Sequence, residues 1–201
     1  SKHLTSRIDR PAVEWASMVE YACTATAQKF RVPAPICDLS QVSGQPMTGF
    51  AVDPFLPLGE TTVIYGDGDS GKSLFALAIC CAVLTKRSLP AGIRPLVTGP
   101  CLYYDYETSA QDQALRLTML ARGCGAIDAP ALAYRRMSRP LADETAVIRR
   151  DVAEQKPVLL VVDSIAPACQ GAIEQTAEPV LRFMNSLRDV APGVTKLVIS
   201  H

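Results

Sequence analysis

One eight-residue segment restricts the possible folds of this chain more than any other part of the sequence. The segment Gly66-Asp67-Gly68-Asp69-Ser70-Gly71-Lys72-Ser73 matches the pattern G-x-x-x-x-G-K-[ST] at every fixed position. A β-branched and aromatic run over residues 61–65 precedes it, and an Ala- and Leu-rich run without helix breakers, residues 74–84, follows it. The sequence therefore predicts a strand, a glycine-rich loop and a helix in direct succession.

This arrangement is typical of a loop that binds phosphate groups. Glycines allow the backbone to wrap closely, so that its N–H groups point at phosphate oxygens, and the helix adds the positive end of its dipole. Lys72 is expected to reach the outer phosphates and the Ser73 hydroxyl to bind Mg²⁺, which makes residues 66–73 a candidate site for a nucleoside triphosphate. An ordinary glycine-rich turn before a buried helix is the alternative interpretation.

Length and composition limit the class of protein. The chain has 201 residues, 48% of them apolar and 20% charged, which suffices for one sizeable core and makes two full domains unexpected. No apolar run approaches the length of a membrane span and the first residues lack a signal peptide, so we expect a cytoplasmic protein with no membrane partner. The formal net charge is zero, which gives no support to a nucleic-acid partner. Two histidines, and seven cysteines without a C-x-x-C pair, argue against a zinc site and indicate reduced thiols.

The N-terminal part of the chain differs in pattern from the rest. Residues 11–30 carry apolar side chains at a spacing that fits one face of a helix. Residues 31–59 contain five prolines, too many for regular structure. We expect residues 1–48 to form a helix and an extended proline-rich arm, and residues 49–201 to form the core.

In the predicted core, strands and helices alternate. Uninterrupted apolar strands that alternate with helices predict an α/β fold, with a mainly parallel sheet covered by helices on both faces. We expect strands over residues 61–65, 101–106, 131–135, 158–162 and 196–200, and helices over residues 74–84, 110–122, 143–155 and 178–190.

The aliphatic run over residues 158–162 is followed by a carboxylate, Asp163. Ligands of open parallel sheets bind at the carboxyl ends of the strands. An aspartate there is the expected partner of the Ser73 hydroxyl in holding Mg²⁺, the position usually called Walker B. Because many α/β strands end in a capping aspartate, this assignment depends on the phosphate loop that precedes it in the chain.

A second acid, Glu107, follows the predicted strand over residues 101–106. Hydrolysis needs a group that orients and deprotonates the attacking water, and a carboxylate can serve. Glu107 is therefore the candidate catalytic base. Asp105 is a rival carboxylate, and a glutamate at this place also favours the start of the helix that follows.

The last predicted strand, residues 196–200, is followed by His201. In the usual order of P-loop sheets this strand lies between the strand before the loop and the Walker B strand, which places Ser200 and His201 beside the γ-phosphate. His201 is a candidate sensor of that phosphate, since convergent polar groups in one pocket mark a site. An incidental terminal histidine is the alternative.

Together these motifs resemble those of the RecA-like ATPases, and within them the branch typified by the plasmid replicative helicase RepA. The resemblance covers residues 50–201 and implies a RecA-like P-loop fold with ATP and Mg²⁺ as cofactors. It also implies that Glu107 is the catalytic base, that Arg116 packs against adenine, and that His201 senses the bound nucleotide. The matching segments are residues 66–73, 104–107, 135–136, 139–143, 161–164 and 198–201.

The chain departs from the family pattern in two ways. Asp67 and Asp69 put negative charge into a loop where many relatives carry small or neutral residues. Their side chains must point outward, be offset by Mg²⁺ and Lys72, or weaken binding. Relatives also continue past the position of His201 with further strands, a DNA-contacting loop and often an arginine finger, so we expect the core to be C-terminally incomplete.

The leading hypothesis is an Mg²⁺-dependent ATPase that acts as the motor of a ring-forming homo-oligomer, a hexamer if RepA-like, in DNA replication or unwinding. Single-stranded DNA is then a candidate partner. The alternative is an ATP-gated loader or regulatory switch, favoured by the neutral charge and by the absence of Lys and Arg from residues 164–171. A kinase would share the phosphate loop, but Glu107 with Asp163 fits water as the acceptor better. Five arginines form either a basic patch for DNA or a solvated charged face: Arg135, Arg136, Arg139, Arg149 and Arg150.

Overall fold

The computed structural model describes residues 19, 36–41, 49–169 and 177–200. The chain divides into two units, residues 1–44 and residues 45–201. In the first unit the structure describes a short 3₁₀ helix, η1 (Leu39–Gln41). The helix predicted over residues 11–30 lies almost wholly outside the described residues. The second unit contains the phosphate loop, and its architecture positions the site.

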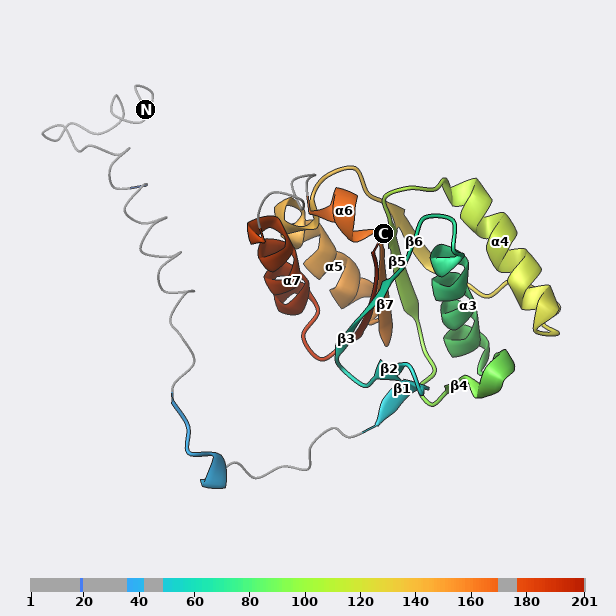
Figure 1. Ribbon diagram of the computed structural model, residues 1–201, viewed down its shortest axis with the longest axis horizontal. Helices are drawn as coiled ribbons and strands as arrows, with labels where there is room; N and C mark the ends of the chain where they lie inside the picture. The colour runs from blue at the N-terminus through green and yellow to red at the C-terminus, as the bar shows by residue number, and fades with distance from the viewer. Residues whose placement is uncertain (1–18, 20–35, 42–48, 170–176, 201) are drawn as a thin grey trace, which may run out of the picture. The chain divides into compact units, whose positions relative to one another are not determined.

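A five-stranded parallel sheet forms the centre of the second unit (Figure 1). Its strands are β3 (Thr61–Tyr65), β5 (Cys101–Asp105), β6 (Ala133–Arg136), β7 (Leu159–Asp163) and β8 (Thr195–Ser200). They lie in the order β3-β8-β7-β5-β6, and each neighbouring pair is parallel. The predicted α/β fold is confirmed, and β8 lies between the strand before the phosphate loop and the strand that ends at Asp163, as expected.

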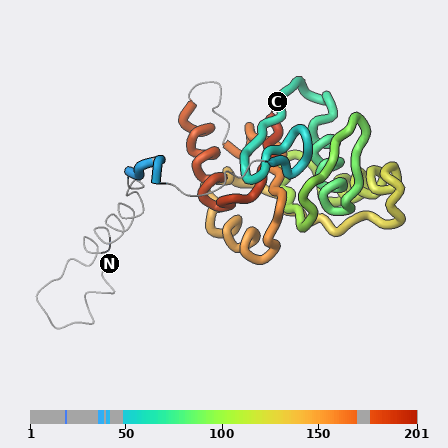
Figure 2. Tube along the Cα trace, turned by 90° about the horizontal axis from the view of Figure 1, so that it is seen from below, coloured from blue at the N-terminus to red at the C-terminus, as the bar shows by residue number. Residues whose placement is uncertain are grey.

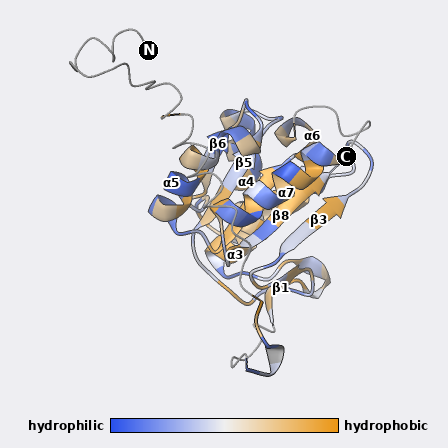
Figure 3. Ribbon diagram, turned by 90° about the vertical axis from the view of Figure 1, so that its left-hand side faces the viewer, coloured by the Kyte–Doolittle hydropathy of each residue, from blue (hydrophilic) through white to orange (hydrophobic). Residues whose placement is uncertain are grey.

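Helices cover both faces of this sheet because side chains alternate along each strand. Tyr103 of β5 packs into a cluster with Leu77, whereas Tyr104 packs into a second cluster with Phe183. Figure 1 shows helices on both sides of the strands, and Figure 2 shows the same molecule from below; in Figure 3 the strands behind the helix over residues 178–190 are mostly coloured hydrophobic. The first layer contains α3 (Lys72–Thr85) and α4 (Ala110–Gly123); the second contains α5 (Thr145–Gln155), the short α6 (Ile165–Ala168) and α7 (Glu178–Val190).

A small antiparallel sheet lies beside the main one and corrects the prediction that residues 31–59 lack regular structure. Its strands are β1 (Phe50–Asp53), β2 (Leu56–Pro57) and β4 (Arg94–Pro95), in the order β2-β1-β4. Both strand prolines lie in the two outer strands, where a missing N–H does not break the ladder. Val52 and Leu56 are fully buried in the cluster that contains Tyr103, so apolar packing outweighs the proline content here.

Most predicted elements of the core match the observed ones closely, and the differences are at their ends. The strand predicted over residues 131–135 is β6 and starts two residues later. The helix predicted from residue 143 begins at Thr145, because a 3₁₀ turn, η3 (Leu141–Asp143), occupies its first part. The helix predicted over residues 178–190 is α7 with the same bounds.

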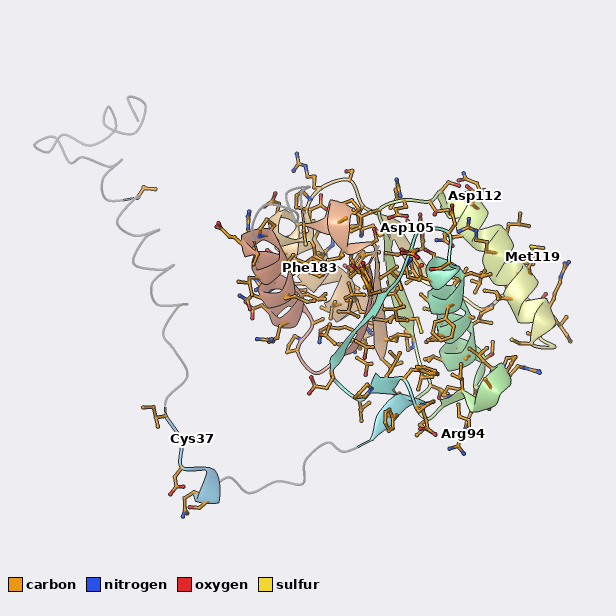
Figure 4. All side chains as sticks on the ribbon, viewed as in Figure 1. Cys37, Arg94, Asp105, Asp112, Met119 and Phe183 are labelled. Carbon is orange, nitrogen blue, oxygen red and sulfur yellow. The ribbon has the colours of Figure 1, made fainter. Side chains whose placement is uncertain are left out.

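The packing of α7 on the sheet gives a first prediction. Phe183 of α7, labelled in Figure 4, is 1% exposed. Phe183→Ala should lower the free energy of unfolding by about 3–5 kcal/mol, because a large buried side chain is lost and a cavity remains. Urea denaturation measures this loss. Leu181→Ala, in the same helix and 61% exposed, is the matched control and should change stability by no more than about 0.5 kcal/mol.

Candidate nucleotide-binding site

The phosphate loop connects β3 to α3 at the carboxyl edge of the sheet. Its backbone passes through left-handed conformations at Asp69, with φ 57°, and at Gly71, with φ 83°. Glycine takes such a conformation without the penalty that a side chain imposes, which accounts for Gly71 at the helix start. Gly71 caps α3 without a side-chain hydrogen bond. The first N–H groups of α3 have no partners within the helix and are therefore suited to bind an anion.

Lys72 lies inside the loop and is 7% exposed. Its ammonium group donates to the carbonyl oxygens of Gly66 at 2.7 Å and Asp67 at 2.6 Å. It also lies 3.1 Å from the Ser70 hydroxyl, which in turn donates to the Asp67 carbonyl at 2.7 Å. The positive charge is thus held at the centre of the loop by uncharged oxygens.

A cavity of about 390 Å³ opens at this loop and brings together residues that are far apart in the sequence. The carboxyl end of β5 contributes Glu107 and Thr108 to its wall, and α4 contributes Arg116. An apolar groove of about 690 Å³ between α3 and α4 adjoins the cavity, since Leu74 and Arg116 line both. The loop residues that line the cavity are Asp69, Ser70, Gly71, Lys72 and Ser73.

Asp163 ends β7 and is 1% exposed. Its Oδ2 atom accepts a hydrogen bond from the Tyr103 hydroxyl at 2.7 Å. Burial raises the pKa of the Asp163 carboxyl, and hydrogen bonds from Tyr103 and Ser73 oppose this shift. The contact with Ser73 brings the two predicted Mg²⁺ ligands together.

The donor set around Asp163 fits a divalent cation. Its Oδ1 atom is buried and has no hydrogen-bond partner among the described residues. A carboxylate oxygen and a hydroxyl oxygen are ligands that Mg²⁺ prefers. No group of three or more His, Cys, Asp or Glu side chains able to hold a metal occurs in the part of the chain that the structure describes. Phosphate and water oxygens would have to supply the other ligands, which is usual for Mg²⁺ at a nucleotide.

Glu107 follows β5, and its Oε1 atom accepts a hydrogen bond from the Ser164 hydroxyl. Ser164 comes directly after Asp163, so the ends of β5 and β7 are joined through the predicted catalytic carboxylate. Neither Ser164 nor Tyr103 was predicted from the sequence to have a role in the site. The sequence signals for Ser164 are its place directly after Asp163 and within the matching segment over residues 161–164, and nothing in the sequence distinguishes Tyr103 from Tyr104 in the same strand.

Asp105, the rival carboxylate, is fully buried. Asp105 ends β5 and is labelled in Figure 4. Its two oxygens accept hydrogen bonds from backbone N–H groups and from side chains of β6 and α4. Asp105 does not line the cavity at the phosphate loop. The geometry therefore favours Glu107 over Asp105 as the group that meets water.

Two further predictions have different outcomes. His201 lies outside the described residues, although Ser200 ends β8 between β3 and β7, where the phosphate sensor was expected.

Of the five arginines considered for a DNA patch, Arg135 forms a bidentate ion pair with Asp151 at 2.6 and 2.7 Å. Arg136 pairs with Asp105 at 3.3 Å. Each of these two charges is paired with a buried carboxylate, although both arginine side chains remain partly exposed, and this pairing weakens the interpretation as a basic patch.

A phosphate loop at the edge of a parallel sheet, with a buried aspartate at the end of another strand of that sheet, defines the class of P-loop ATPases. The model of one family, described as AAA domain, matches residues 37–201, and the chain belongs to this family. Nucleotide binding and ATPase activity are the properties of that class. A search among curated proteins found no match. No helix within the described residues is long and apolar enough to cross a membrane.

The environment of Lys72 gives a second prediction. Lys72→Ala should weaken nucleotide affinity about 10- to 100-fold, because a charged hydrogen bond to the phosphates is lost. Titration with a fluorescent ATP analogue measures the dissociation constant. Lys86→Gly removes the same charge at the other end of α3, where φ is 58° and glycine is tolerated, and should leave affinity unchanged. Unchanged binding in Lys72→Ala would show that the nucleotide binds elsewhere.

Proposed function

We propose that this domain binds ATP with Mg²⁺ and hydrolyses it, as the motor domain of a RecA-like, RepA-type replicative helicase. The observation that carries the proposal is the single cavity in which the phosphate loop faces Glu107 and Arg116. Three separate parts of the chain supply the groups that ATP hydrolysis needs: a phosphate cradle, a carboxylate for water, and a planar cation suited to stacking on a base.

In this proposal Lys72 and the loop N–H groups bind the β- and γ-phosphates, and Arg116 packs against the adenine. Ser73 and Asp163 hold Mg²⁺, which supplies positive charge next to the phosphate oxygens. Glu107 accepts a proton from the water that attacks the γ-phosphorus. The bond from that phosphorus to the bridging oxygen breaks, and ADP leaves with the electron pair. His201 is proposed to report the state of the γ-phosphate.

Glu107→Gln gives a third prediction. The amide cannot accept the proton from water, so kcat should fall about 100-fold or more while ATP affinity is retained. Steady-state phosphate release and equilibrium binding of ATP measure the two quantities separately. Glu154→Gln removes an equivalent charge on the exposed surface of α5 and serves as the control. Wild-type turnover in Glu107→Gln would assign the base role to Asp105 or to another group.

The second candidate function is an ATP-gated loader or switch that does not unwind DNA. The ion pairs of Arg135 with Asp151 and of Arg136 with Asp105 favour it, since each carboxylate offsets a positive charge that a phosphate backbone would otherwise attract. The resemblance to replication ATPases favours the helicase. Both functions share the same ATPase site and differ in what the site controls.

Single-stranded DNA separates the two functions. A helicase motor should bind it and hydrolyse ATP several-fold faster in its presence, with affinity that falls as salt rises because counterions are released. ATPase rates with and without DNA, together with fluorescence anisotropy of a labelled oligonucleotide, test this. If DNA neither binds nor alters turnover of the encoded full-length protein, the helicase proposal fails and the switch is supported.

A further inference from the structure

Asp105 is a buried acid that accepts several hydrogen bonds and does not line the nucleotide cavity. One of its oxygens, Oδ1, accepts from the N–H groups of Glu107 at 2.7 Å and Thr108 at 2.8 Å. The other, Oδ2, accepts from the side-chain amide of Gln113 at 2.8 Å. Arg136 lies 3.3 Å from Oδ1 and supplies the opposite charge. A buried carboxylate costs free energy unless it is bonded in this way, and an apolar side chain would fill the same space without that cost. Packing alone therefore does not account for Asp105.

The bonds of Asp105 are not needed to start α4. Ser109 is the cap of that helix, and its hydroxyl accepts the Asp112 N–H at 3.1 Å. Asp105 instead binds the two residues before the cap. Two successive N–H groups bonded to one oxygen fix the path of the backbone through Glu107.

Thr108 is held from a second side as well. The Tyr134 hydroxyl donates to its carbonyl oxygen at 2.8 Å and lies 3.3 Å from Oδ2 of Asp105. Tyr134 and Arg136 belong to β6, and Gln113 belongs to α4. Hydrogen bonds therefore connect the turn after β5 to both β6 and α4. Ser164 then holds the other end of Glu107, at the carboxylate.

We propose that Asp105 is a positioning residue for ATP hydrolysis: its buried carboxylate fixes the backbone of Glu107, so that the Glu107 carboxylate meets the attacking water in a productive orientation. The inference rests on the proposed function of Glu107. A displacement of about 1 Å at a reacting group can cost about 100-fold in rate, so a turn held by hydrogen bonds has a direct effect on turnover.

Two substitutions of Asp105 separate positioning from charge. Asp105→Ala removes the acceptor for both N–H groups and should lower kcat about 10- to 100-fold, with ATP affinity within about twofold of wild type. Asp105→Asn keeps an oxygen for those N–H groups. Its new NH₂ group can donate to Oε1 of Gln113, a buried atom without a partner among the described residues, once the Gln113 amide flips. Asp105→Asn should therefore retain kcat.

The double variant of Asp105→Ala with Glu107→Gln separates a positioning role from a structural one, because the two roles predict different losses of kcat in the Glu107→Gln background. If Asp105 acts through Glu107, Asp105→Ala should cause no further loss of turnover in the Glu107→Gln background. Asp151→Ala is the matched control, because Asp151 is also buried and bonded to Arg135 and Tyr104, away from the cavity. It should lower the unfolding midpoint and leave kcat per folded molecule unchanged.

Tyr134→Phe is the second variant, in case Asp105→Ala does not fold. It removes only the hydroxyl on the Thr108 carbonyl and should reduce kcat several-fold in the wild-type background alone. The proposal is overturned by wild-type kcat in a folded Asp105→Ala, by equal losses in both backgrounds, or by a stable Asp105→Asn with the turnover of the alanine variant. Should Asp105→Ala not fold, wild-type kcat in Tyr134→Phe overturns it. If Glu107→Gln itself hydrolyses ATP normally, the proposed role of Glu107 as the base fails instead.

Discussion

The parallel register between β5 and β7 is the constraint on which the rest of the site depends. It places Asp105 directly opposite Asp163 at the carboxyl edge of the sheet. Glu107 and Ser164 follow on the two strands and meet through a hydrogen bond, while Tyr103 reaches the Asp163 carboxylate. A slip of one residue in either strand would exchange the faces of its side chains and separate all these groups.

Asp105 and Asp163, two buried aspartates on adjacent strands, differ in the hydrogen-bond donors that surround them. Asp105 has Arg136 and several N–H groups, which satisfy both of its oxygens. Asp163 receives a hydrogen bond from the Tyr103 hydroxyl, keeps one buried oxygen without a partner among the described residues, and has a raised pKa because of its burial. The oxygens of Asp105 are all bonded, which suits a residue that holds the backbone in place. Asp163 has an oxygen left to bind a cation.

Much of the core was predictable because its signals are local. Strand and helix periods are properties of neighbouring residues, and the succession of β3, loop and α3 follows from one motif. The small antiparallel sheet was missed, since the prolines of residues 31–59 were given more weight than the apolar residues Val52 and Leu56, which the structure buries. Prolines at the outer strands of a sheet do not prevent strand formation, and only the tertiary neighbours show which strands are outer.

The sequence by itself determined the class of fold and the phosphate loop, because glycine conformation and hydrophobic period act over a few residues. It also named Glu107, Arg116 and Asp163 as candidates, and the structure brings Glu107 and Arg116 into the wall of one cavity with the loop. Only the tertiary structure placed Asp105 in the interior and Glu107 at the cavity, and paired Arg135 and Arg136 with buried aspartates. Those outcomes depend on partner residues from other strands and helices. Strand order and register bring these residues together, and no local sequence pattern encodes them.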